Sequence, residues 1–154
     1  MKKLIFLFIV SLFSIAATGQ TNFSGTWKLN SSRSTLGDQF SMAPKDIIIV
    51  QEGNLFNVEK HYNFQDRDVT TNDKLTMDGK ECENPGWRDS IKKSVAEWAP
   101  DKKCLKVTSK IPAGDAGEMT IVIVYKMDDE NLVVQLDASS SMGELSETFY
   151  FDKQ

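Results

Sequence analysis

Residues 23–30 read FSGTWKLN and open the part of the chain that has the pattern of a folded domain. Gly25 and Trp27 stand at the start of TWKLN (26–30), the first of many short runs rich in β-branched and aromatic residues. Turn residues such as QEGN (51–54) separate these runs. Short β-type runs with regular turn signals predict an antiparallel all-β domain. In such a domain, Trp27 is either an ordinary packing residue or the residue that closes one end of a barrel.

Residues 1–19 have the pattern of a secretory signal peptide. Two lysines precede an apolar core, LIFLFIVSLF (4–13), which is too short to span a bilayer as a helix. Small residues at the end of this segment predict cleavage before Gln20, and no cysteine lies nearby to carry a lipid anchor. We therefore expect a secreted or periplasmic protein without stable membrane insertion, whose mature part, residues 20–154, is one domain.

The charge of the chain excludes some classes of partner. The formal net charge is −4, and loss of the two N-terminal lysines with the signal peptide changes it to −6. The few arginines (Arg33, Arg67 and Arg88) and the lysines are scattered along the sequence. Nucleic-acid binding needs clustered positive charge, so we expect no nucleic-acid partner.

Two cysteines, Cys82 and Cys104, belong to a chain that is predicted to reach an oxidising compartment. The sequence therefore favours a disulfide between them. The alternative is two reduced thiols, because the intervening run SIKKSVAEW (90–98) separates the segments that carry the cysteines. Two cysteines and one histidine without a C-x-x-C pair make no zinc site, so we expect no metal.

The strand pattern favours a barrel over a sandwich. In LFNVEKHYNF (55–64), Phe56, Val58 and Tyr62 share one face, as a half-buried strand requires. EMTIVIVYKM (118–127) is the most apolar run, and its valines and isoleucines favour a strand over a helix. The Cys…Trp…Cys spacing of an immunoglobulin sandwich is absent. The one long connection, residues 30–45, has room for a helical turn or a lid.

FSGTWKLN, LTMDGKE (75–81) and the C-terminal pattern G-E…F-x-K resemble the calycin superfamily, which contains the lipocalins and fatty-acid-binding proteins. The resemblance is greatest to exported bacterial lipocalin-like proteins of unassigned function. It implies an up-and-down antiparallel β-barrel of about eight to ten strands after the signal peptide. It also implies that Trp27 plugs one end of the barrel, with the Lys153 ammonium over the indole.

The sequence departs from this family in one respect that bears on the ligand. Fatty-acid-binding proteins hold a carboxylate with Arg-x-Tyr on the last strand, whereas TFYFDK (148–153) has Phe149 and Phe151 at the matching positions. A buried carboxylate without a cation is costly to desolvate. The resemblance therefore implies a neutral or weakly polar apolar ligand.

The alternating strand faces predict the residues that line the interior. The predicted lining set is Phe56, Val58, Tyr62, Ile121, Ile123, Tyr125, Phe149 and Phe151. In a small barrel these side chains either fill the interior or leave room for one ligand. Lys60 interrupts the apolar face of its strand, and is either a polar contact in the pocket or a side chain that reaches out to water.

Catalytic residues are not apparent. His61 is the only histidine and shares a strand face with Glu59, but no nucleophile motif accompanies them. Glu144 and Glu147 would have to act as a carboxylate pair to cleave a glycoside. The sequence predicts no enzyme and no cofactor.

The sequence as a whole predicts a monomeric, exported, lipocalin-like protein that binds a small apolar or weakly polar molecule. The alternative is a barrel that binds a protein or glycan through its loops, especially residues 31–45 and 112–118. An enzyme built on the barrel is the third possibility.

Overall fold

Ten antiparallel strands form one continuous sheet within the residues that the structure describes, 19–154. In this computed structural model the strands are β1 (Gly25–Leu29), β2 (Asp46–Glu52), β3 (Leu55–Phe64), β4 (Arg67–Thr76), β5 (Glu81–Pro85), β6 (Ile91–Trp98), β7 (Leu105–Pro112), β8 (Glu118–Asp128), β9 (Asn131–Ser140) and β10 (Gly143–Lys153), with a 3₁₀ turn, η1 (Gly114–Ala116), before β8. Apart from Gly19, the predicted signal peptide lies outside the described residues.

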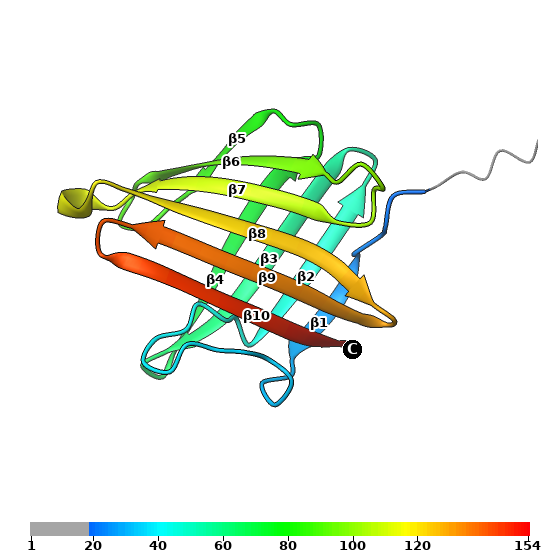
Figure 1. The fold of residues 1–154 in the computed structure, drawn as a ribbon, viewed down its shortest axis with the longest axis horizontal. Helices are drawn as coiled ribbons and strands as arrows, with labels where there is room; N and C mark the ends of the chain where they lie inside the picture. Colours follow the sequence, from blue (N-terminus) through cyan, green and yellow to red (C-terminus); the bar gives the residue numbers. More distant parts are fainter. Residues whose placement is uncertain (1–18) are drawn as a thin grey trace, which may run out of the picture.

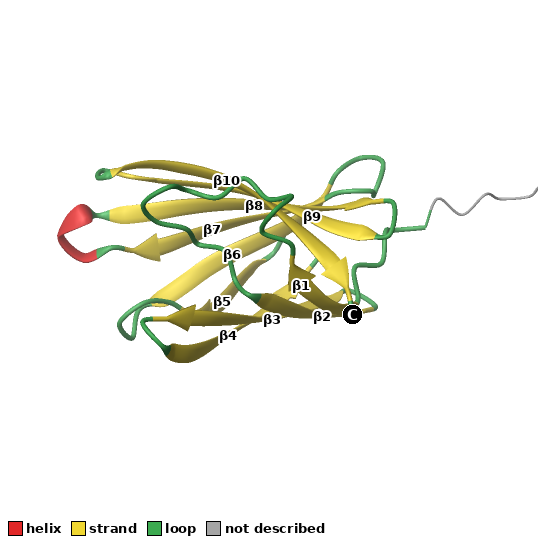
Figure 2. Ribbon diagram, turned by 90° about the horizontal axis from the view of Figure 1, so that it is seen from below, coloured by secondary structure: helices red, strands yellow, loops and turns green. Residues whose placement is uncertain are grey.

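The strands follow an up-and-down order that curls into a barrel. Hydrogen bonding runs in the order β4-β3-β2-β1-β10-β9-β8-β7-β6-β5. Figure 1 shows β1–β4 crossing obliquely behind β7–β10, and Figure 2 shows the same two layers from the edge. Inward side chains of both layers form one core. The predicted all-β, up-and-down barrel is confirmed.

The strand that the sequence did not predict is β5. Its residues, ECENP, combine two glutamates, an asparagine and a proline, which are all depleted in strands. Proline is tolerated here because β5 is at an end of the sheet order. The predicted runs 26–30, 55–64, 90–98 and 118–127 coincide with β1, β3, β6 and β8 to within one residue.

Side chains close the barrel where β4 and β5 end the sheet. The Lys74 backbone N–H donates to Asn84 Oδ1 at 2.8 Å, and Asn84 Nδ2 donates to the Lys74 carbonyl at 3.1 Å. One buried amide thus joins the two edge strands where ladder bonds would otherwise lie. This contact protects two strand edges that would otherwise be open to pairing.

Trp27 is buried in the core of the barrel, next to Phe23. It is 1% exposed, and its indole Nε1 donates to the Phe23 carbonyl at 2.9 Å. Gly25 has φ +152°, a backbone conformation that residues with a side chain rarely adopt, which explains the glycine two residues before the tryptophan. Lys153 lies opposite Trp27 in the β1–β10 ladder, with Nζ 5.8 Å from the indole centroid.

The long connection, residues 30–45, forms a strap along β10. It contains turns and a single β-bridge. The Glu147 carboxylate, which is 2% exposed, accepts backbone hydrogen bonds from Gly37 and Met42, each at 2.8 Å. Gly37 is required because a Cβ there would lie 2.1 Å from the Phe40 carbonyl oxygen. Glu147 thus anchors the strap to the barrel wall, which is a structural role.

The structure contradicts the predicted disulfide, because Cys82 and Cys104 are both free thiols in the described chain. Cys82 lies opposite Ser94 on β6, and Ser94 lies opposite Ser109 on β7, five residues beyond Cys104. Two strand spacings of about 5 Å and five residues of about 3.3 Å separate the cysteines. This is well beyond the roughly 7 Å between Cα atoms that a disulfide can bridge.

Candidate functional site

A cavity of about 640 Å³ occupies the barrel interior. Its mouth lies at the end opposite Trp27 and is ringed by the half-exposed or exposed side chains of Phe40, Phe64, Val69 and Trp87. These residues come from the strap, from the β3–β4 hairpin and from the β5–β6 turn. The interior is therefore open, which decides between the two alternatives that the strand pattern left.

Six of the eight residues predicted to line the interior do so: Tyr62, Ile121, Ile123, Tyr125, Phe149 and Phe151. The other two, Phe56 and Val58, also point inward but belong to the packed core at the closed end. Phe56 makes an edge-to-face contact with Phe23 and another with Tyr125. The alternation on β3 therefore predicted the correct face, but not the depth at which packing ends and the cavity begins.

Sequence reasoning missed most of a charged cluster on the cavity wall. Lys60 on β3 and Lys92 on β6 both bind Asp73 on β4, and we call these three residues the Lys–Asp–Lys cluster. Lys60 Nζ is 2.9 Å from Asp73 Oδ2, and Lys92 Nζ binds Asp73 Oδ1. The side chains are only 10–14% exposed. Lys60 is thus a polar contact in the pocket rather than a side chain that reaches out to water.

A signal for this cluster exists in the sequence. Lys60 is two residues from both Val58 and Tyr62 and so shares their face of β3. In the same way, Asp73 shares a face with Leu75, and Lys92 shares a face with Ser94 and Ala96. Each charged residue therefore occupies an inward position of its strand. Side-chain period alone identifies the three positions, but only the barrel geometry shows that they meet.

The three charged groups of the cluster shift one another's pKa values to different extents. Burial alone would raise the pKa of Asp73, but Lys60 and Lys92 outweigh it and lower that pKa. Burial opposes the charge of Lys60 as well, yet nearby Tyr125 and Asp73 raise its pKa. The pKa of Lys92 is lowered by burial and by the Lys60 charge, which Asp73 offsets only in part. Burial raises the pKa of Tyr125 to about 12, so its hydroxyl stays neutral.

His61 and Glu59 lie on the outer face of β3, away from the cavity lining. His61 Nε2 is 2.6 Å from Glu59 Oε1, and Nδ1 binds Asp46 on β2. These hydrogen bonds raise the pKa of His61, and the bond to Glu59 contributes more than the bond to Asp46. The histidine is therefore held between two carboxylates on the surface.

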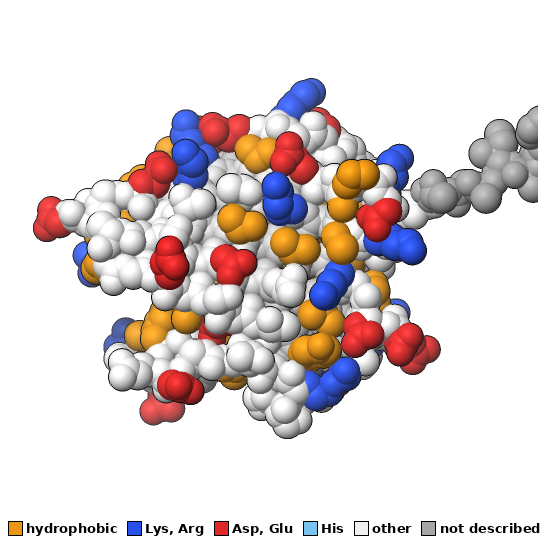
Figure 3. Space-filling model, in the orientation of Figure 1, with side chains coloured by type: hydrophobic (Ala, Val, Ile, Leu, Met, Phe, Trp, Pro, Cys, Tyr) orange, Lys and Arg blue, Asp and Glu red, His pale blue; other side chains and the backbone are white. Residues whose placement is uncertain are grey.

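The outer face of the front layer carries charges of both signs. Figure 3 shows acidic and basic side chains interspersed over the face that β6–β10 form. The residues that the structure describes contain no group of three potential metal ligands. Within the same residues, no helix is long and apolar enough to cross a membrane.

Neither the family models nor the curated protein sequences contain a match to the chain. Two solved structures share its fold. A "secretary abundant heat soluble (SAHS) protein" of Ramazzottius varieornatus is 14% identical, with a TM-score of 0.63 over 86% of this chain and 95% of that chain. The zebrafish ileal bile acid-binding protein, solved with cholic acid, is 16% identical, with a TM-score of 0.60 over 86% of this chain and 98% of that chain. Both are calycin-like barrels. The chain shares their barrel fold.

Proposed function

We propose that this calycin barrel binds one small, mainly apolar molecule in its interior and catalyses no reaction. The observation that carries the proposal is the cavity of about 640 Å³, which is open at one end and walled chiefly by apolar side chains. Small-molecule sites are typically concave, mainly apolar and roughly 300–1,000 Å³ in volume. The zebrafish protein of the same fold was solved in complex with cholic acid, which supports a ligand of this size.

A non-catalytic role is supported by how the polar groups are used. The cavity-lining Ser109 is hydrogen-bonded to Ser94, with the two hydroxyl oxygens 2.7 Å apart. His61, the only histidine, faces outward. General acid–base chemistry needs a free titratable group within reach of the bound molecule. The titratable side chains of the Lys–Asp–Lys cluster do line the cavity, but they are paired with one another.

We also propose that the protein is exported after cleavage before Gln20. The segment that would begin the mature chain is part of the barrel, since the Thr21 N–H donates to the Lys102 carbonyl at 3.0 Å and Phe23 is fully buried. Cleavage at Gln20 would leave these contacts intact. The SAHS protein is secreted, as its name indicates, which agrees with this location.

Native mass spectrometry of the mature protein purified from its host tests the binding role. We expect a non-covalent adduct of small-molecule mass that disappears when the protein is denatured in organic solvent. The mass of the polypeptide alone, under conditions that keep the barrel folded, would argue against an interior ligand.

A further inference from the structure

The Lys–Asp–Lys cluster lies halfway along the barrel rather than at its mouth. On β3 and β4, the pair Phe56 and Leu75 marks the packed end, and the pair Phe64 and Arg67 marks the open end. Lys60 pairs with Thr71 in this ladder, midway between those two pairs. A molecule that enters through the mouth is therefore already partly out of water when it reaches the cluster.

The cluster holds more positive charge than its own carboxylate neutralises. The charged residues that line the described cavity are Lys60, Asp73, Arg88 and Lys92. Asp73 pairs with the two buried lysines, and Arg88 is exposed. The chain as a whole is acidic, with a net charge of −4. The net positive charge of the cavity lining is therefore opposite in sign to the net charge of the whole chain. Lys60 and Lys92 share the single carboxylate of Asp73, so one buried positive charge has no counter-charge, which is costly, and a bound anion would supply it.

Closure of the barrel accounts for only part of this arrangement. The pair between Asp73 and Lys92 joins β4 to β6 and could act as a clamp beside Asn84. A clamp needs one ammonium for one carboxylate. Lys92 supplies that ammonium, whereas Lys60 pairs with Asp73 from β3, which is already hydrogen-bonded to β4, so Lys60 exceeds what closure requires.

We propose that the interior ligand is an amphipathic anion whose singly charged head group binds at Lys92 and Lys60. Its apolar body would lie against the opposite wall, where Ile123 and Phe149 line the cavity. This assignment rests on the proposed interior binding role and replaces the neutral ligand that the absence of an inward arginine implied. Two lysines from β3 and β6 supply the cation that the last strand lacks.

Two fluorescent probes of nearly identical shape test this assignment. 1-Anilinonaphthalene-8-sulfonate carries a sulfonate, and N-phenyl-1-naphthylamine is the same skeleton without it. We expect the wild-type mature protein to bind the sulfonate about 10- to 100-fold more tightly, as hydrogen bonds to buried charged groups typically allow. Lys92→Met and Lys60→Met should each remove most of this preference while the neutral probe still binds.

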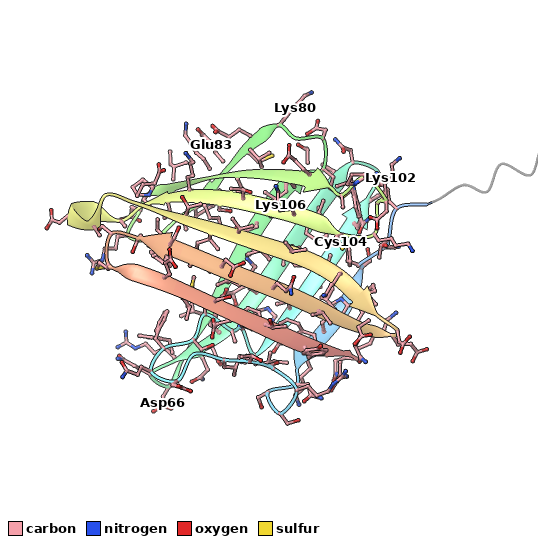
Figure 4. All side chains as sticks on the ribbon, in the orientation of Figure 1. Asp66, Lys80, Glu83, Lys102, Cys104 and Lys106 are labelled. Carbon is pink, nitrogen blue, oxygen red and sulfur yellow. The ribbon has the colours of Figure 1, made fainter. Side chains whose placement is uncertain are left out.

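A charge-neutralising variant of Asp73 separates a head-group site from a structural clamp. Asp73→Asn leaves two cations without a carboxylate and should increase the preference for the sulfonate, whereas loss of a clamp would weaken both probes together. Lys106→Met and Glu83→Gln are the matched controls, since both side chains are exposed on outer strand faces (Figure 4). We expect both controls to leave the preference unchanged.

The outcomes distinguish the two proposals. Equal binding of the two probes by the wild-type protein would overturn the anionic head group but keep the interior site. A preference that Lys106→Met lowers as much as Lys92→Met would also overturn it, because the charge effect would then be general. Failure of both probes to bind would contradict the interior site itself.

Discussion

Lys60 and Asp73 form an ion pair inside the barrel, with Nζ 2.9 Å from Oδ2, although the two residues are not direct partners in their ladder. Lys60 lies opposite Thr71, and Asp73 is two residues further along the same face of β4. The pair is therefore diagonal, which leaves the second carboxylate oxygen free to bind Lys92. One carboxylate thus ties three strands together inside an apolar cavity.

The variant Asp73→Asn should lower the free energy of unfolding by about 3 kcal/mol, because it leaves two buried ammonium groups without their carboxylate. Urea unfolding followed by far-UV circular dichroism measures the change. Glu83→Gln, on the exposed face of β5, is the control and should change stability by less than about 0.5 kcal/mol. Equal effects in the two variants would show that the cluster contributes nothing to folding.

The contribution of the Asp73 carboxylate to stability should also depend on pH in the acid range. The pKa of Asp73 is lowered in the folded protein, so its contribution is fully present above the unfolded value of about 3.9. The contribution is lost as the pH falls below that value and through the lower folded pKa. The stability difference between the wild type and Asp73→Asn should therefore shrink between about pH 4 and the acid transition. A constant difference over this range would contradict the lowered pKa.

His61 should titrate above its ordinary pKa of about 6.5, because Glu59 and Asp46 accept hydrogen bonds from its ring. The stabilisation that its charge provides is full below about pH 6.5 and is lost as the pH rises through the raised folded pKa. The only histidine gives unambiguous ring-proton NMR signals. A midpoint at or below 6.5 would be inconsistent with the two carboxylate contacts.

Glu147→Ala should free the strap, because it leaves the Gly37 and Met42 N–H groups without an acceptor. We expect a loss of about 2 kcal/mol in stability and faster hydrogen exchange at these two amides. Glu144→Ala is the matched control, since Glu144 lies three residues away on β10 and is exposed. Unchanged exchange at the two amides of the strap would refute the anchoring role of Glu147.

The sequence predicted the apolar residues of the cavity wall better than the charged residues. Alternation along β8 placed Ile121, Ile123 and Tyr125 on the inner face, because an inward apolar side chain repeats every second residue. The strand β5 was missed because its polar residues and Pro85 carry little β-propensity, and it is held partly by the amide of Asn84. Propensity cannot report a side-chain contact across the edge of a sheet.

The cluster and the strap anchor depend on contacts between distant residues. Asp73 and Lys92 are 19 residues apart and come from strands separated by β5, and Glu147 binds a backbone more than 100 residues away. Sequence alternation gives the face of each residue, but closure of the barrel decides which faces meet. The disulfide prediction was wrong for the same reason, since β6 separates Cys82 on β5 from Cys104, which immediately precedes β7.

The central claim is that a small molecule binds inside the barrel, and titration with N-phenyl-1-naphthylamine tests it most directly. Ile123→Trp places a larger side chain in the cavity, and Val124→Trp places the same side chain on the outer face of the same strand. A clash inside a formed cavity costs 1–3 kcal/mol, or roughly tenfold in affinity. The account predicts that Ile123→Trp weakens binding about tenfold while Val124→Trp leaves it unchanged. Equal affinities in the two variants would contradict an interior site.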